Sequence, residues 1–232
     1  MALNAREVAG GGTPQEPIDP GSYPGRLVQV IGLGLQPQSY EGEEKKPQLE
    51  ISVTYELLDE FTKDEEGNDN EEKPRWQSET FALHNLAADK AKSTQRYYAL
   101  DPDEKHEGDW SKLLGTPCVV TIVNKAGSGK NKGKIYNNVG GLASMRPKEA
   151  AKAKALVNPT KYFDPSEPDI EVFMSLPDWL QKKIKKGLEY GGSDLENLVD
   201  NYKAKDGDKK KPKPKGKEIE EADDEEEDKI NW

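Results

Sequence analysis

One loop of the sequence, SGKNKGKIYNNVGG at residues 128–141, is rich in glycine and lysine and follows a strand-like segment, TPCVVTIVN (116–124). This arrangement raises the question of whether the loop binds the phosphates of a nucleotide. A nucleotide-binding P-loop needs G-x-x-x-x-G-K-[ST] between a strand and a helix, so that backbone N–H groups and the helix N-terminus meet the phosphates. Here Ile135 stands where the Ser or Thr belongs, and a strand follows. The nucleotide interpretation therefore fails.

Two interpretations of the loop remain: a flexible hairpin with solvated lysines, or a loop that contacts the phosphates of a longer nucleic acid. Single-strand binding combines cations for phosphates with aromatic rings on which bases stack, and each stacked ring contributes roughly 1–3 kcal/mol. Rings stand beside cationic or polar neighbours in Arg75-Trp76 and in Tyr136-Asn137-Asn138. The candidate DNA-binding residues are Arg26, Tyr40, Arg75, Trp76, Lys125, Lys130, Lys132, Lys134 and Tyr136. Four other aromatic residues, Tyr55, Phe81, Trp110 and Trp179, are assigned to packing.

Catalytic and metal-binding chemistry has little support in the sequence. One cysteine and two histidines are too few for a Cys/His zinc site, and Cys118 lies among valines as a buried strand residue would. The carboxylates of DPDEKHEGD (101–109) are typical of a solvated turn, and the acidic loop 61–74 lacks the residue order of an EF-hand. We therefore expect no enzyme activity, no cofactor and no metal.

The formal net charge of −10 hides a strong segregation of charge along the chain. Residues 56–72 hold nine acidic residues and one lysine, whereas residues 111–154 hold nine basic residues and one glutamate. The C-terminal region changes sign, with eight lysines in 203–217 and nine acidic residues in 218–232. This pattern predicts one basic surface, one acidic loop and a tail of two parts.

The alternation of apolar and polar residues predicts five strands. LEISVTYELLD (49–59) alternates most regularly, which predicts a strand with one buried and one solvated face. The other predicted strands are 26–36, 75–84, 116–124 and 134–145, with a helix after Asn85 between the third and the fourth. A mainly β chain with this order has the layout of a five-stranded oligonucleotide-binding (OB) barrel, whose loop between strands 4 and 5 faces the ligand.

The regions outside this barrel divide by composition. Residues 1–21 form a flexible arm, residues 22–157 the OB domain, and residues 158–202 a helical extension that docks on the barrel or on a second copy of the chain. A helix is predicted from Trp179, with a capping box at Ser175 and Asp178. Ser193 and Glu196 are predicted to open a second, short helix. Residues 203–217 form a basic linker, and residues 218–232 a disordered acidic tail with an aromatic tip. No stretch is apolar enough to span a membrane or to serve as a signal peptide, so we expect a cytoplasmic protein.

The chain resembles the bacterial single-stranded DNA-binding proteins and a phage-encoded group of them. The resemblance rests on the strand layout of 22–145, on segments such as LEISVTYELLDEF and NNVGGLASMRP, and on the tip EEADDEEEDKINW. It implies an OB fold that coats and protects single-stranded DNA in phage replication or recombination, in the host cytoplasm. It also implies that the tip recruits replication or recombination proteins through Asp228, Ile230 and Trp232. The tip departs from the Asp-Ile-Pro-Phe ending of the bacterial proteins.

A rival function remains open at this stage. The acidic loop and tail would also suit a DNA-mimic or adaptor protein that binds a basic host enzyme and no DNA, although the basic stretch 111–154 argues against it. In the DNA-binding interpretation the tail competes with DNA for the basic groove and leaves its tip for a partner. Both interpretations allow a homo-oligomer.

Overall fold

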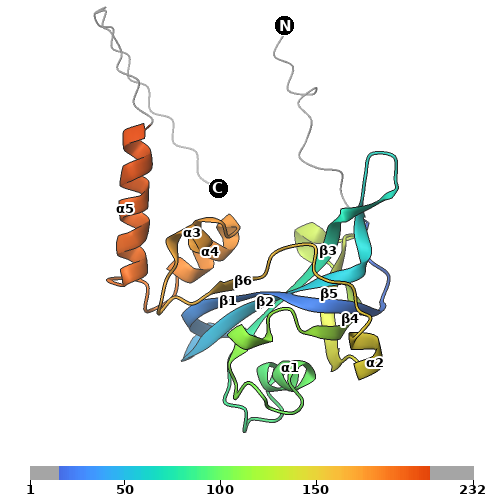
Figure 1. Cartoon of the computed structure of the whole chain (residues 1–232). Helices are drawn as coiled ribbons and strands as arrows, with labels where there is room; N and C mark the ends of the chain where they lie inside the picture. Colours follow the sequence, from blue (N-terminus) through green and yellow to red (C-terminus); the bar gives the residue numbers. More distant parts are fainter. Residues whose placement is uncertain (1–15, 210–232) are drawn as a thin grey trace, which may run out of the picture.

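The structure is a computed structural model that describes residues 16–209 and confirms a mainly β chain. Its longest strands form two hairpins, β1–β2 and β2–β3, and a third hairpin joins β4 to β5 (Figure 1). The strands are β1 (Gly21–Tyr40), β2 (Glu43–Lys63), β3 (Asp69–Ala82), β4 (Pro117–Ala126), β5 (Ile135–Ser144) and β6 (Lys161–Phe163). The helices are α1 (Lys92–Leu100), α2 (Pro147–Ala150), α3 (Ile170–Met174), α4 (Asp178–Lys185) and α5 (Asp194–Lys209), with short 3-10 turns η1 (Trp110–Leu113) and η2 (Gly129–Asn131).

The sheet has the order β3-β2-β1-β4-β5, and its neighbouring strands are antiparallel. The first residues of β1 pair with β4, whereas its middle pairs with β6 in parallel. The strands at the two ends of this order, β3 and β5, approach each other, but the sheet does not close. The segment before β1 lies at this seam, because the backbone N–H and C=O of Ile18 both bond to the amide of Asn137 in β5 (2.8 Å each). Ile18 itself is buried, so the expected flexible arm is packed from at least this residue onward.

The inner face of the sheet carries the main core. The predicted alternation of β2 places Ile51, Val53, Tyr55 and Leu57 in this core, together with Leu27 of β1. The α1 helix covers it from below in Figure 1, and Tyr97 of α1 packs edge-on against Trp110 of η1. Cys118 and Trp110 are buried here, as expected.

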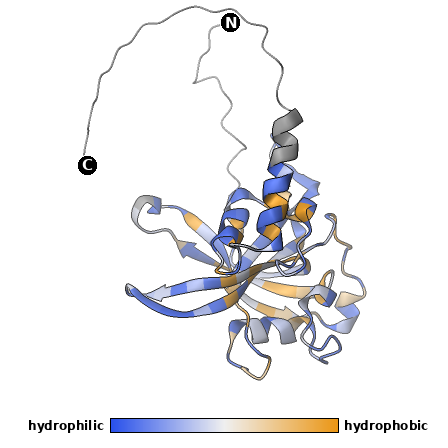
Figure 2. Ribbon diagram, turned by 90° about the vertical axis from the view of Figure 1, so that its left-hand side faces the viewer, coloured by the Kyte–Doolittle hydropathy of each residue, from blue (hydrophilic) through white to orange (hydrophobic). Residues whose placement is uncertain are grey.

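The outer face of β2 is not solvated, which corrects the expectation from its alternation. Ser52, Thr54 and Glu56 are buried, and the segment between α2 and β6 crosses this face at Glu56, to which Val157 and Asn158 bond. Further along the same face, Ile31 and Leu33 of β1 pack against β6, α3, α4 and α5 in a second core. Both faces of the central strands are therefore covered. Figure 2 shows the apolar positions concentrated where the strands cross, with mostly hydrophilic residues toward the strand ends.

The helical region begins and ends differently from the prediction. The α4 helix ends at Lys185, and α5 continues to Lys209, so it extends into the predicted basic linker. Within residues 16–209, no helix combines the length and the apolar character that a membrane span requires.

Candidate nucleic-acid interface

The basic loop of the sequence forms the turn of the β4–β5 hairpin. Lys125 lies opposite Tyr136 in the ladder, and the hairpin closes through a hydrogen bond from the backbone N–H of Gly127 to the carbonyl of Lys134 (2.8 Å). The side chains of Lys125, Lys132 and Lys134 are exposed. Lys130 lies in η2, and its side chain is outside the described part of the chain. The loop therefore presents lysines and a ring on one hairpin, as single-strand binding would need.

Tyr136 lies against the backbone of its own loop. A Cβ atom added at Gly127 would be 2.9 Å from Cε2 of the Tyr136 ring and 2.3 Å from the carbonyl oxygen of Asn131. Real Cβ atoms essentially never come so close, so only glycine fits beneath this ring. Tyr136 is 43% exposed, and its neighbour Ile135 is 53% exposed. Tyr136 is thus supported on one side and open to solvent on the other.

Trp76 has the same combination of support and exposure. It lies in β3 opposite Glu56 of β2, is 40% exposed, and donates a hydrogen bond from its indole Nε1 to Oε2 of Glu56 (3.1 Å). The carboxylate of Glu56 also accepts bonds from the backbone N–H of Val157 (2.7 Å) and from Nδ2 of Asn158 (2.7 Å). These donors compensate the cost of burying the polar carboxyl group. The indole of Trp76 is therefore held by a carboxyl group that is itself held by Val157 and Asn158.

Trp76 and Tyr136 lie on the outer surface, on either side of the seam between β3 and β5. Their sequence neighbours Arg75 and Asn137 both bind the N-terminal segment: Nη1 of Arg75 donates to the carbonyl of Glu16 (2.7 Å), and Asn137 bonds to Ile18. Because successive side chains of a strand point to opposite faces, the two rings point away from this segment. Arg75 has a backbone partner at the seam.

Arg26 lies apart from this group and has a structural role. Its guanidinium donates to three backbone carbonyls, those of Gly115 (2.7 Å), Lys154 (2.8 Å) and Ala153 (3.1 Å). The fork of donors with which an arginine would clamp a phosphate is thus engaged by the protein itself. Its location beside the segment after α2 explains this use.

Tyr40 is the most exposed of the predicted rings, at 65%. It lies at the end of β1, where Glu41 and Gly42, with φ of 53° and 84°, turn the chain into β2. This hairpin is separate from the β4–β5 hairpin, and no described contact joins Tyr40 to the other predicted residues. The predicted residues Asp228, Ile230 and Trp232 lie outside the described residues.

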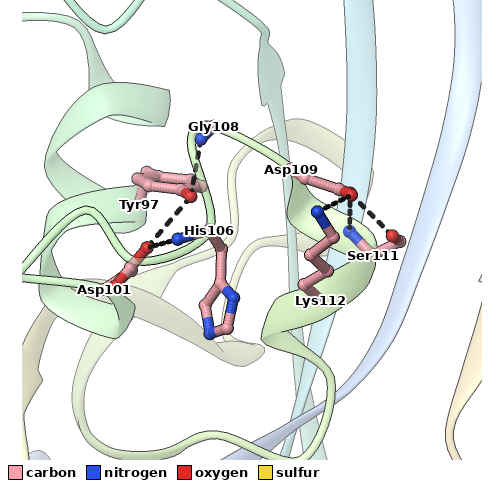
Figure 3. A network of polar contacts seen from close by, with 7 residues as sticks. All are labelled: Tyr97, Asp101, His106, Gly108, Asp109, Ser111 and Lys112. Atoms are coloured by element: carbon pink, nitrogen blue, oxygen red, sulfur yellow. Dashed lines mark hydrogen bonds and ion pairs between the residues drawn. The ribbon is translucent and has the colours of Figure 1, made fainter.

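The carboxylates of loop 101–109 are engaged in local structure (Figure 3). Asp101 accepts from the backbone N–H groups of His106 (2.8 Å) and Lys105 (3.0 Å) and from the hydroxyl of Tyr97 (3.2 Å), which itself accepts from the N–H of Gly108 (2.8 Å). Burial alone would raise the pKa of Asp101, but the bonds from His106 and Lys105 bring it below its usual value. These bonds organise the turn.

A second carboxylate of this loop caps η1 (Figure 3). Asp109 accepts from the backbone N–H and the hydroxyl of Ser111 (2.9 and 2.6 Å), and these bonds, with that from Lys112, keep the pKa of Asp109 low. Across residues 16–209, no group of three or more His, Cys, Asp or Glu residues is arranged to hold a metal ion.

A buried ionic network joins α1 to the inner face of the sheet. Glu79 of β3 accepts from Arg96 of α1 (2.8 Å) and from the hydroxyl of Tyr55 (3.1 Å), and pairs with Lys92 (2.7 Å). Burial first, and then the charge of Glu79, raise the pKa of Tyr55 well above its usual value. The charge of Glu79 is thus paired with those of Arg96 and Lys92, so the network leaves no buried carboxylate without a partner.

For two residues, Trp179 and Glu56, the burial in the structure differs from the sequence prediction. Trp179, assigned to packing, is 56% exposed on α4. Glu56, assigned to a solvated face, is fully buried. The helical periodicity of Leu180 and Ile184 marks the buried side of α4 and leaves Trp179 off it, which is the signal that could have identified the tryptophan as exposed.

No protein-family model, curated protein or solved structure matches this chain.

Proposed function

We propose that this chain is a single-stranded DNA-binding protein that coats DNA with little regard to its sequence. In this proposal the five long strands form an OB-type barrel whose seam between β3 and β5 is filled by the N-terminal segment. The strand order β3-β2-β1-β4-β5, with α1 between β3 and β4 in the chain, supports it, because an OB barrel has this order. The phage origin and the role in replication or recombination follow from the resemblance in sequence.

The observation that carries the proposal is the placement of two supported, exposed rings beside a lysine-bearing hairpin. Trp76 and Tyr136 lie on the outer surface across the seam, and Lys125 is the ladder partner of Tyr136. Rings held by their surroundings lose little conformational freedom when a base stacks on them. Bases would stack on these two rings while the phosphates follow Lys125, Lys132 and Lys134.

The acidic residues have a separate place in this mechanism. The turn of the β2–β3 hairpin, from Asp64 to Asn68, is held by two bonds from backbone N–H groups to Asp64 (2.9 Å each), so its carboxylates stay at the end of that hairpin. DNA would avoid this hairpin and follow the β4–β5 hairpin. The acidic tail of residues 218–232 would compete with DNA for the same lysines and present its tip to a replication protein.

The test is fluorescence anisotropy of the full chain with labelled oligo-dT and with a duplex of equal length, at two salt concentrations. We expect oligo-dT to bind more tightly than duplex and its affinity to fall with salt, because bound cations release counterions from the strand. Trp76→Ala and Tyr136→Ala should each weaken binding. Tyr162→Ala is the matched control, because Tyr162 is similarly exposed (42%) but lies in β6, away from the seam.

Equal affinity for both DNA forms, or no binding at low salt, would reject the proposal. The second outcome would favour the adaptor function, in which the acidic hairpin and tail bind a basic protein.

A further inference from the structure

Trp179 is a large apolar side chain that the protein leaves 56% exposed. It lies in the first turn of α4, outside the buried side on which Leu180 and Ile184 pack in one core with Ile31 and Leu33 of β1. The α4 helix therefore packs on the sheet through Leu180 and Ile184, and Trp179 is not part of that core. A single exposed apolar side chain is common on protein surfaces, so a ligand site at Trp179 also needs support from the residues around it.

The helix is held firmly on the sheet. Nζ of Lys183 pairs with Oε2 of Glu50 in β2 (2.6 Å), and Gln36 of β1 donates to the carbonyl of Lys183 (3.2 Å). Beyond the helix, the backbone N–H of Leu188 bonds to the carbonyl of Leu35 (2.8 Å). These bonds fix the direction in which the exposed side of α4 points.

The α4 helix and the ring of Trp76 both contact the outer face of β2. Glu50 pairs with α4 and Glu56 bonds to Trp76, and the two glutamates are six residues apart on β2, so their side chains point to the same side. At 3.2–3.4 Å per residue, they are about 20 Å apart along the strand. Figure 1 shows α3, α4 and the segment that leads to β6 all above the sheet. Trp179 precedes Lys183 by one helical turn and so lies near it.

Positive charge accompanies this exposed ring. Lys182 and Lys186 follow Trp179 at i+3 and i+7, which places them on its side of the helix, and both are exposed. Lys183 is neutralised by Glu50, but neither Lys182 nor Lys186 has an acidic partner at ion-pair distance among the described residues. A ring flanked by unpaired lysines repeats the chemistry of the β4–β5 hairpin.

We propose that Trp179, Lys182 and Lys186 form a second contact site for single-stranded DNA, so that one strand spans from the rings at the seam to α4. This inference rests on the proposed function. Charge selects the ligand, because lysines beside an indole suit a polyanion with flat bases. One OB fold covers about 4–16 nucleotides, which leaves room for a strand that reaches both places.

The test compares labelled oligo-dT of about 6 and about 16 nucleotides on the full chain, the lengths being chosen within the range for one OB fold. Trp179→Ala should weaken binding of the long oligonucleotide by roughly fivefold to a hundredfold and leave the short one, bound at the seam, nearly unchanged. Trp179→Phe, which keeps a ring, should restore most of the affinity. Lys182→Ala with Lys186→Ala should make the salt dependence of the long oligonucleotide shallower by about one to two units. Lys90→Ala, at an exposed lysine in the loop before α1, is the control.

Three outcomes would overturn the inference. If Trp179→Ala binds both lengths like the wild type while Trp76→Ala weakens both, α4 makes no contact and only the proposed function stands. If the wild type binds neither length at low salt, the proposed function itself fails. If the effect of Trp179→Ala disappears in a chain truncated after Lys217, the surface binds the chain's own acidic segment instead of DNA. Circular dichroism of each variant checks that the fold is retained.

Discussion

The indole Nε1 of Trp76 lies 3.1 Å from Oε2 of Glu56, a carboxylate with no exposed surface. The same carboxylate binds the backbone of residues 157 and 158. One buried carboxyl group therefore positions an exposed ring and also holds the segment that crosses the outer face of β2. A surface feature and the packing of the sheet are linked through a single side chain.

Glu56→Gln should destabilise the protein by about 1–3 kcal/mol, because the new amide NH₂ faces groups that are themselves donors. Urea denaturation followed by circular dichroism measures this change. Glu43→Gln, at an exposed position in the same strand, is the control and should change stability little. An unchanged denaturation midpoint for Glu56→Gln would show that the bonds to Glu56 contribute nothing net.

Replacing Lys125, Lys132 and Lys134 together by alanine should weaken oligo-dT binding about equally for every sequence. The slope of log K against log salt should become shallower by about two to three units, because binding releases fewer counterions when fewer phosphates are neutralised by lysines. Anisotropy titrations at several salt concentrations measure the slope. An unchanged slope would return these lysines to the solvated hairpin considered from the sequence.

Local sequence patterns predicted the five long strands well. The features that the sequence analysis did not predict depend on contacts between distant segments of the chain. The alternation of β2 identified its inner face correctly, and the predicted start of a helix at Ser193 is confirmed, because its hydroxyl accepts from the N–H of Glu196 (3.2 Å). Ser175 fits the same pattern but ends α3, and its hydroxyl donates to the carbonyl of Val172 (2.6 Å). Two short helices in succession offer a serine to either one, and sequence spacing does not choose between them.

The burial of Glu56 could not be predicted because two of the residues that donate to it, Val157 and Asn158, lie about a hundred residues later in the chain. The same holds for Arg26, whose partners include Ala153 and Lys154. An arginine and a glutamate in strands look like surface residues until the crossing segment is placed. The ring-and-lysine pattern of the β4–β5 hairpin was visible because it lies within one hairpin.

Gly127→Ala should disturb the β4–β5 hairpin, because the added methyl group would collide with the carbonyl of Asn131 and the ring of Tyr136. We expect a modest loss of stability, about 1–3 kcal/mol as for other overpacked positions, and weaker binding of oligo-dT. Thermal denaturation and anisotropy measure the two effects. Gly191→Ala is the control, since nothing lies within 4 Å of its added Cβ. Wild-type behaviour of Gly127→Ala would mean that the loop relaxes freely and does not position the ring.

Asp101 should make the stability of the protein fall in acid. Its pKa in the folded protein is lowered, so its contribution is complete above the unfolded-state pKa of about 3.9 and is lost as the pH falls through the folded value. Urea denaturation between about pH 6 and pH 3, followed through the fluorescence of the tryptophans, measures this loss. Other carboxylates titrate in the same range, so the informative quantity is the difference between wild type and Asp101→Asn. This difference should be largest near neutral pH and shrink in acid; a difference independent of pH would contradict the assignment.

The acidic tail gives the last prediction, which rests on sequence because residues 218–232 lie outside the described part. Truncation after Lys217 removes nine acidic residues together with the aromatic tip. We expect tighter binding of oligo-dT, most clearly at low salt, because the carboxylates no longer compete with phosphates for the hairpin lysines and Coulomb forces are least screened there. Trp232→Ala keeps the charge, so it should leave DNA affinity near the wild type while weakening capture of a replication or recombination protein. Weaker DNA binding after truncation would instead assign the tail a solubilising role.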